Sequence, residues 1–99
     1  MVVIPPMTPR EHADALVRCL TGYVAKRDDS ANRENLRVAT EWLRLIDAED
    51  PAAADIEALA ASLETLEFAG SITVDLKIGV SAWVPPARRR AIMRRKTAG

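Results

Sequence analysis

Residues 71–84 read SITVDLKIGVSAWV, and every second position from 72 to 84 is apolar. The apolar positions are Ile72, Val74, Leu76, Ile78, Val80, Ala82 and Val84. Strict alternation is typical of a strand with one buried face, and the richness in Val, Ile and Thr also favours a strand. Wound as a helix, the same residues would be scattered around the axis. The pattern therefore predicts extended structure at 72–84.

A single straight strand of this length does not suit a chain of 99 residues. It would extend roughly 46 Å, whereas the radius of gyration expected for the chain is about 13 Å. Folding back with a three-residue loop at 77–79 places Leu76 opposite Val80 and keeps the apolar side chains of the two arms on one face. Gly79 then occupies the loop position that needs a positive φ, and Ile78 is left exposed at the tip. A β-hairpin and a bent strand are the two main interpretations of 72–84, and a helix is the third.

Helix starts can be recognised earlier in the chain. Thr8 can cap a helix, Pro9 suits the first helical position, and Glu11 stands where the acid of a capping box reaches back. Pro51 suits the first position of a later helix, with Asp50 as its cap. These residues predict where the first and third helices begin.

Apolar residues at helical spacing predict three amphipathic helices before the extended segment. Their expected ranges are 9–27, 30–49 and 51–68. Ala69 and Gly70 should close the last one, because glycine tolerates the left-handed turn that ends many helices. Helices joined by short loops form a bundle. The predicted fold class is therefore α+β, mainly α: a three-helix bundle followed by the hairpin or bent strand.

The chain is expected to form a single domain, 1–99. Residues 1–7 form an N-terminal arm, in which Val2-Val3-Ile4 can add an edge strand. Residues 85–99 begin with the pair Pro85-Pro86 and form a basic C-terminal tail. We expect this tail to be a short helix or an extended arm.

The sequence also indicates a compartment. The lone cysteine, Cys19, cannot form a disulfide within the chain, so nothing requires an oxidising environment. No apolar run approaches the roughly 18 residues that span a membrane, and the start lacks the features of a secretory signal. We expect a cytoplasmic protein with no membrane partner.

Charge is strongly segregated although the net charge is zero. Residues 41–75 hold nine acids and only one basic residue, whereas residues 76–99 hold seven basic residues and no acid. The acidic surface predicted on the third helix consists of Asp55, Glu57, Glu64 and Glu67. The basic residues of the tail are Arg88, Arg89, Arg90, Arg94, Arg95 and Lys96. Such asymmetry predicts electrostatic docking, either within the molecule or on a partner.

No catalytic, metal or cofactor motif is recognisable. His12 and Cys19 lie two helical turns apart, roughly 10 Å along the axis, which is too far for a nucleophile–base pair. Cys19 is instead expected to be a half-buried apolar residue. His12 has no second metal ligand one turn away, so a zinc site is not supported. The glycines are isolated, which argues against a phosphate-binding loop. We therefore expect neither an enzyme nor a cofactor.

Trp83 lies on the polar side of the alternating pattern. It is either covered by the tail or exposed at an open strand edge, where Trp would act as a binding anchor. The leading hypothesis is a small regulatory protein of the adaptor or inhibitor type, which binds a protein through the acidic third helix and the strand edge at Trp83. The alternative is a nucleic-acid-binding protein that uses the tail. A second alternative is a self-assembling structural protein, in which the tail of one copy docks on the acidic surface of the next. A homodimer through the strand edge is a further form of self-association.

Overall fold

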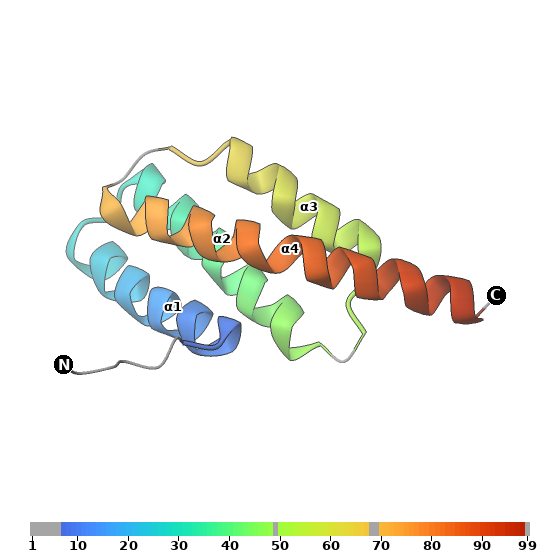
Figure 1. The fold of residues 1–99 in the computed structure, drawn as a ribbon. Helices are drawn as coiled ribbons and strands as arrows, with labels where there is room; N and C mark the ends of the chain where they lie inside the picture. Colours follow the sequence, from blue (N-terminus) through green and yellow to red (C-terminus); the bar gives the residue numbers. More distant parts are fainter. Residues whose placement is uncertain (1–6, 49, 68–69, 99) are drawn as a thin grey trace.

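The computed structural model describes residues 7–48, 50–67 and 70–98, with side chains described up to Met93. Within these residues the protein has four helices and no strand. The helices are α1 (Pro9–Lys26), α2 (Ser30–Asp47), α3 (Ala53–Glu64) and α4 (Ser71–Ala98). Successive helices run in opposite directions, as the chain colouring of Figure 1 shows. The protein is a helical bundle with up-down connections.

The starts of α1 and α2 follow from side-chain caps. Thr8 and Glu11 form the predicted capping box, in which each side chain bonds the other residue's backbone N–H. At α2, the Asp29 carboxylate accepts a hydrogen bond of 2.8 Å from the backbone N–H of Asn32. These caps satisfy amide groups that have no partner inside the helix.

The limits predicted for the third helix are wrong at both ends. Its N-cap is Ala52, not Asp50, and Ala52 makes no side-chain capping hydrogen bond. At the other end α3 stops at Glu64, where the chain tightens into turns instead of continuing. Gly70 has the expected positive φ of 93° but lies directly before α4, and its carbonyl accepts from Thr73. Residues 49 and 68, and the edge strand predicted at 2–4, lie outside the described residues.

The β-hairpin or bent strand predicted at 72–84 is wrong, because this whole segment belongs to α4. The alternation has a helical explanation. Residues four apart lie on the same side of a helix. A stripe that begins at an even-numbered residue and continues in steps of four therefore contains only even-numbered residues, which an alternating pattern also contains. Ile72, Leu76, Val80 and Val84 form such a stripe, and the odd-numbered Trp83 also faces the core. A helix therefore buries Leu76, Val80 and Val84 of the alternating set, together with two residues, Thr73 and Trp83, that the strand interpretation left outside.

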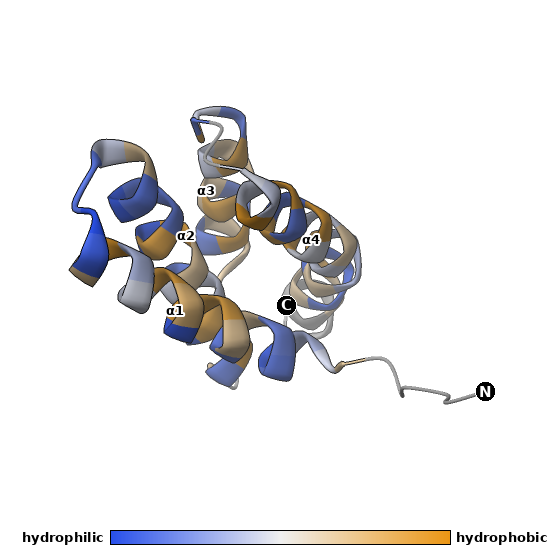
Figure 2. Cartoon of the chain, turned by 90° about the vertical axis from the view of Figure 1, so that its left-hand side faces the viewer, coloured by the Kyte–Doolittle hydropathy of each residue, from blue (hydrophilic) through white to orange (hydrophobic). Residues whose placement is uncertain are grey.

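The core lies where all four helices meet. α4 packs against α1, α2 and α3, while α2 lies between α1 and α3 on the other side. In the end-on view of Figure 2 the helices surround this shared centre. The fully buried side chains from the four helices include Leu20, Trp42, Ile56, Leu59, Leu76 and Val80. Their burial removes apolar surface from water and stabilises the bundle.

Gly79 allows α4 to approach α1 and α2 closely. A Cβ atom at Gly79 would lie 2.7 Å from Cη2 of Trp42 and 2.8 Å from the His12 ring. Those two rings pack edge to face, with centroids 5.5 Å apart. Nε2 of His12 also lies 3.1 Å from Oδ2 of Asp75, one turn before the glycine. Gly79 therefore serves close packing, not the hairpin loop expected from the sequence.

α4 continues through Pro85 and Pro86 to Ala98, so the expected break before the tail is absent. Each proline lacks an N–H, so the carbonyls of Ser81 and Ala82 lose their ordinary helical donors. All four residues are exposed, and water can therefore hydrate these carbonyls. The last turns of α4 extend past the other helices in Figure 1. The basic tail is therefore the C-terminal part of α4 and not a separate element.

Candidate interaction surface

An apolar groove of about 580 Å³ lies between α1 and the first half of α4. Leu16, Cys19 and Tyr23 line it from α1, and residues from Ser71 to Ile78 line it from α4. Three large apolar side chains stand at this groove with much of their surface in solvent. They are Tyr23, 48% exposed, Val74, 45% exposed, and Ile78, 63% exposed. We call this surface, with Leu16, Cys19, Ile72 and Asp75, the α1–α4 face.

The α1–α4 face results from the same alternation that builds the core. Val74 and Ile78 are one helical turn apart, and both lie roughly 160° around the helix from the fully buried Leu76. One set of alternating residues therefore points inward and the other points outward. A helix that is apolar on two sides is typically covered on two sides.

The His12–Asp75 contact anchors one wall of the groove. The His12 side chain is 22% exposed and that of Asp75 is 56% exposed. Together with Gly79, the contact fixes how closely α4 lies on α1. The wall that carries Val74 and Ile78 is therefore held by packing on its inner side, which suits a preformed binding surface.

Trp83 does not lie on a strand edge, because it belongs to α4 and is only 8% exposed. Its indole lines a second cleft of about 510 Å³ between the start of α1, the end of α2 and the second half of α4. Leu45 and Pro86 contribute to the apolar wall, while Arg10 and Arg90 stand at its rim. The predicted strand-edge anchor at Trp83 is therefore wrong.

The four acids predicted to form one surface are distributed around α3 and its end. Asp55 and Glu57 lie about 200° apart around the helix axis, while Glu57 and Glu64 share a side. Glu67 lies beyond the end of α3, in the connection to α4. All four are exposed. The acidic residues therefore cover two sides of α3, and the exposed pair Glu64 and Glu67 stands near the start of α4.

The tail bonds its own molecule through its first arginine. Nη2 of Arg88 donates to Oε2 of Glu57 at 2.9 Å, which fastens α4 to α3. Arg89 and Arg90 are exposed on the next positions. Arg94, Arg95 and Lys96 continue the helix, but their side chains lie outside the described part. Intramolecular docking of the tail is thus seen at Arg88.

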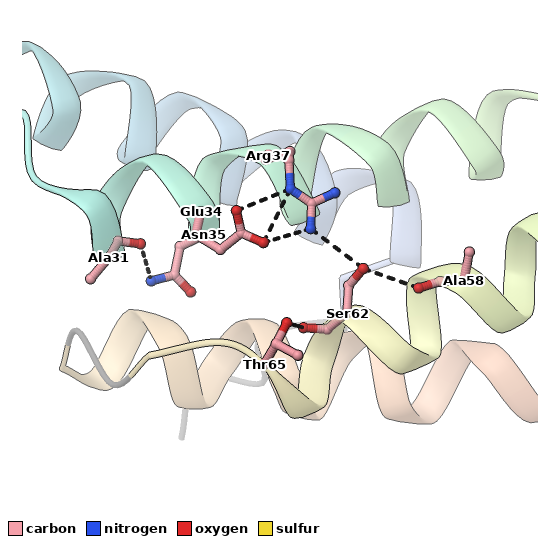
Figure 3. A network of polar contacts seen from close by, with 7 residues as sticks. All are labelled: Ala31, Glu34, Asn35, Arg37, Ala58, Ser62 and Thr65. Carbon is pink, nitrogen blue, oxygen red and sulfur yellow. Dashed lines mark hydrogen bonds and ion pairs between the residues drawn. The ribbon is translucent and has the colours of Figure 1, made fainter.

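A separate polar network joins α2 to α3 (Figure 3). Nε of Arg37 donates to Oε1 of Glu34 at 3.1 Å, and Nη2 of Arg37 lies 3.4 Å from Oγ of Ser62. The hydrogen bond from Arg37 lowers the pKa of Glu34. On the next turns of α2, the hydrogen bond from Arg44 lowers the pKa of Glu41. Both carboxylates are stabilised in their charged form, as expected for an acid next to a guanidinium.

The α1–α4 face is hidden from sequence reasoning as long as 72–84 is interpreted as a strand. A hairpin places Val74 on its buried face and Ile78 at the tip of its loop, and Tyr23 carries no signal of its own. Two apolar sets on opposite sides of a helix are a recognisable signal once 72–84 is treated as a helix. Cys19 is exposed at the groove, so the expectation that it is half-buried is wrong.

None of the four helices is long and apolar enough, over the described residues, to cross a membrane. The described residues also contain no group of three or more His, Cys, Asp or Glu side chains placed to hold a metal ion. Comparisons with known proteins found no matching family model, no similar curated protein and no similar solved structure.

Proposed function

We propose that this chain is a small non-enzymatic interaction protein that recognises another protein through the α1–α4 face. The observation that carries the proposal is the exposure of Tyr23, Val74 and Ile78 around one groove. Single exposed apolar residues are ordinary, but a cluster of large ones marks an interaction site. Tyrosine is also among the residues that contribute most to binding at protein interfaces.

The surroundings of the groove support a protein as the partner. Two helices form its walls, so it has the shape that accepts the apolar side of a further helix. Asp75 lies at the groove and places a carboxylate beside the apolar residues. The partner we propose is a helix with apolar residues one turn apart and a basic residue next to them. The lone cysteine suits a cytoplasmic site of action.

The exposed acids on α3 take a supporting role in this proposal. Glu64 and Glu67 are exposed and can meet a basic partner at the end of the bundle where α4 begins. Glu57 is bound by Arg88. The pKa of Arg44 is raised first by Glu41 and, to a smaller extent, by the charge of Asp55. The apolar face supplies affinity, and the outer acids supply orientation.

A nucleic-acid partner is a second candidate because of one observation. Arg89 and Arg90 are exposed on the second half of α4, whose last turns extend past the other helices. A helix that carries six basic residues between 88 and 96 can follow a phosphate backbone. Titration of labelled duplex DNA and single-stranded RNA across salt concentrations tests this candidate. Binding that Arg89→Gln with Arg90→Gln weakens, and that falls steeply with salt, would support it.

Site-specific photo-crosslinking tests the main proposal. A benzophenone amino acid at Ile78 should give adducts in the cells that produce the chain, and adding Tyr23→Glu should abolish them. The same probe at Thr40, exposed on α2, is the matched control and should give none. Absence of adducts from position 78, or equal adducts from both positions, would contradict the proposal.

A further inference from the structure

The outer side of α4 carries apolar residues well beyond the groove. Val74, Ile78, Pro85 and Ile92 lie within about 40° of one line along the helix, because successive members are four or seven residues apart. Val74, Ile78 and Ile92 are 45%, 63% and 43% exposed. We call this line the outer stripe. It runs along most of a helix whose 28 residues measure about 42 Å.

The two ends of the outer stripe have opposite charge. Arg89 is exposed near its C-terminal end, about 60° around the helix from Ile92. Glu64 and Glu67, also exposed, end α3 and lead into the start of α4. An antiparallel pair of α4 helices brings the basic end of each copy to the acidic end of the other. A parallel pair would instead place arginines beside arginines, which is unfavourable.

We propose that a second copy of this chain occupies the α1–α4 face, with the two α4 helices antiparallel about a two-fold axis. This inference rests on the proposed function and names its partner. Pairing Val74 of one copy with Pro85 of the other places the axis between Ile78 and Ser81. Arg89 of each copy then approaches Glu67 of the other. A two-fold interface of this kind uses the same surface of both copies.

Sedimentation measures the association directly. The wild-type chain should be a dimer at about 100 µM and dissociate on dilution toward about 1 µM. Ile78→Glu should raise the dissociation constant about tenfold or more, because it places a charge in the centre of the apolar contact. Thr40→Glu, exposed on α2, is the matched control and should leave it unchanged. A chain that is monomeric throughout this range overturns the inference.

Cysteine cross-linking tests the orientation. In a Cys19→Ser background, Ser81→Cys lies next to the proposed axis and should form an intermolecular disulfide on mild oxidation. Val74→Cys should not, because the two copies of this residue would be roughly 16 Å apart along the helices. In a parallel pair both variants would cross-link. Efficient cross-linking of the Val74→Cys variant would therefore overturn the antiparallel arrangement.

Charge reversal tests the contact between the ends. Arg89→Glu should weaken the dimer, and adding Glu67→Lys should restore it. Failure of this rescue would contradict the pairing of the two ends.

The photo-crosslinking experiment distinguishes the second-copy inference from the proposed function. Adducts from position 78 to a different protein alone would overturn the second-copy inference and leave the proposed function intact, whereas no adducts would overturn both.

Discussion

The inner and outer sides of α4 are made of the same residue types, yet they meet different surroundings. Leu76 and Val80 are fully buried against the other helices, whereas Val74 and Ile78 are about half exposed. All four belong to one alternating pattern in the sequence. The difference shows that apolar character alone does not assign a residue to the core. The inner side holds the fold together, and we propose that the outer side binds.

The largest expected difference between the two sides concerns stability. Leu76→Ala should lower the free energy of unfolding by about 2–4 kcal/mol, because it leaves a cavity among fully packed neighbours. Ile78→Ala should change it by less than about 0.5 kcal/mol. Urea denaturation at protein concentrations below the association range measures both. Equal losses from the two substitutions would show that the sides of α4 are not distinct.

Replacing glycine by alanine should have opposite effects on stability at Gly79 and at Gly22. Gly79→Ala should destabilise the protein by about 1–2 kcal/mol, because the new methyl group meets Trp42 and His12 at less than van der Waals distance. Gly22 lies in α1, and a methyl group there would point into open space, with no packed neighbour within 4 Å. Gly22→Ala should therefore stabilise the protein by about 0.5–1 kcal/mol. Thermal unfolding distinguishes the two signs, and stabilisation by Gly79→Ala would contradict the close approach of α4.

The smallest expected effect on the free energy of unfolding comes from two ion pairs on α2, away from α4. Glu34 and Glu41 have pKa values lowered from 4.5 by hydrogen bonds from Arg37 and Arg44. Because the folded pKa lies below the unfolded one, their contribution is present above about pH 4.5 and is lost as pH falls through the folded pKa. Each should contribute less than about 1 kcal/mol, since both are near the surface. Unfolding of Glu34→Gln with Glu41→Gln at pH 7 and pH 3 should show a smaller pH dependence than wild type, and an unchanged dependence would contradict these pairs.

The parts of the fold that local interactions determine could be predicted. Thr8 and Glu11 cap α1 through neighbouring residues, so the start of that helix follows from the sequence alone. The end of α3 does not, because Gly70 forms its left-handed turn before α4 and not directly after α3. The glycine predicts a left-handed turn near residue 70, but tertiary packing determines whether the turn ends α3 or precedes α4.

The error at 72–84 has a physical origin. Even-numbered apolar residues fit both a strand and a helical stripe, and only the odd-numbered positions separate them. Thr73 and Ala87 are 1% and 2% exposed, which completes the inner side of a helix. Threonine and alanine are common on protein surfaces, so neither residue indicates from the sequence alone that its position is buried. For the candidate site, composition identified the charged segments, but the outer stripe depends on knowing that α4 is a helix.

Methyl and backbone NMR of the wild-type chain at low and high concentration distinguishes a helix that binds with its outer side from the alternatives. We expect helical backbone shifts throughout 71–93, with concentration-dependent methyl shifts for Val74 and Ile78 and much smaller ones for Leu76 and Val80. That result would establish one helix that folds with its inner side and binds with its outer side. Extended backbone shifts at 72–84, or methyl shifts that do not change with concentration on either side, would contradict it.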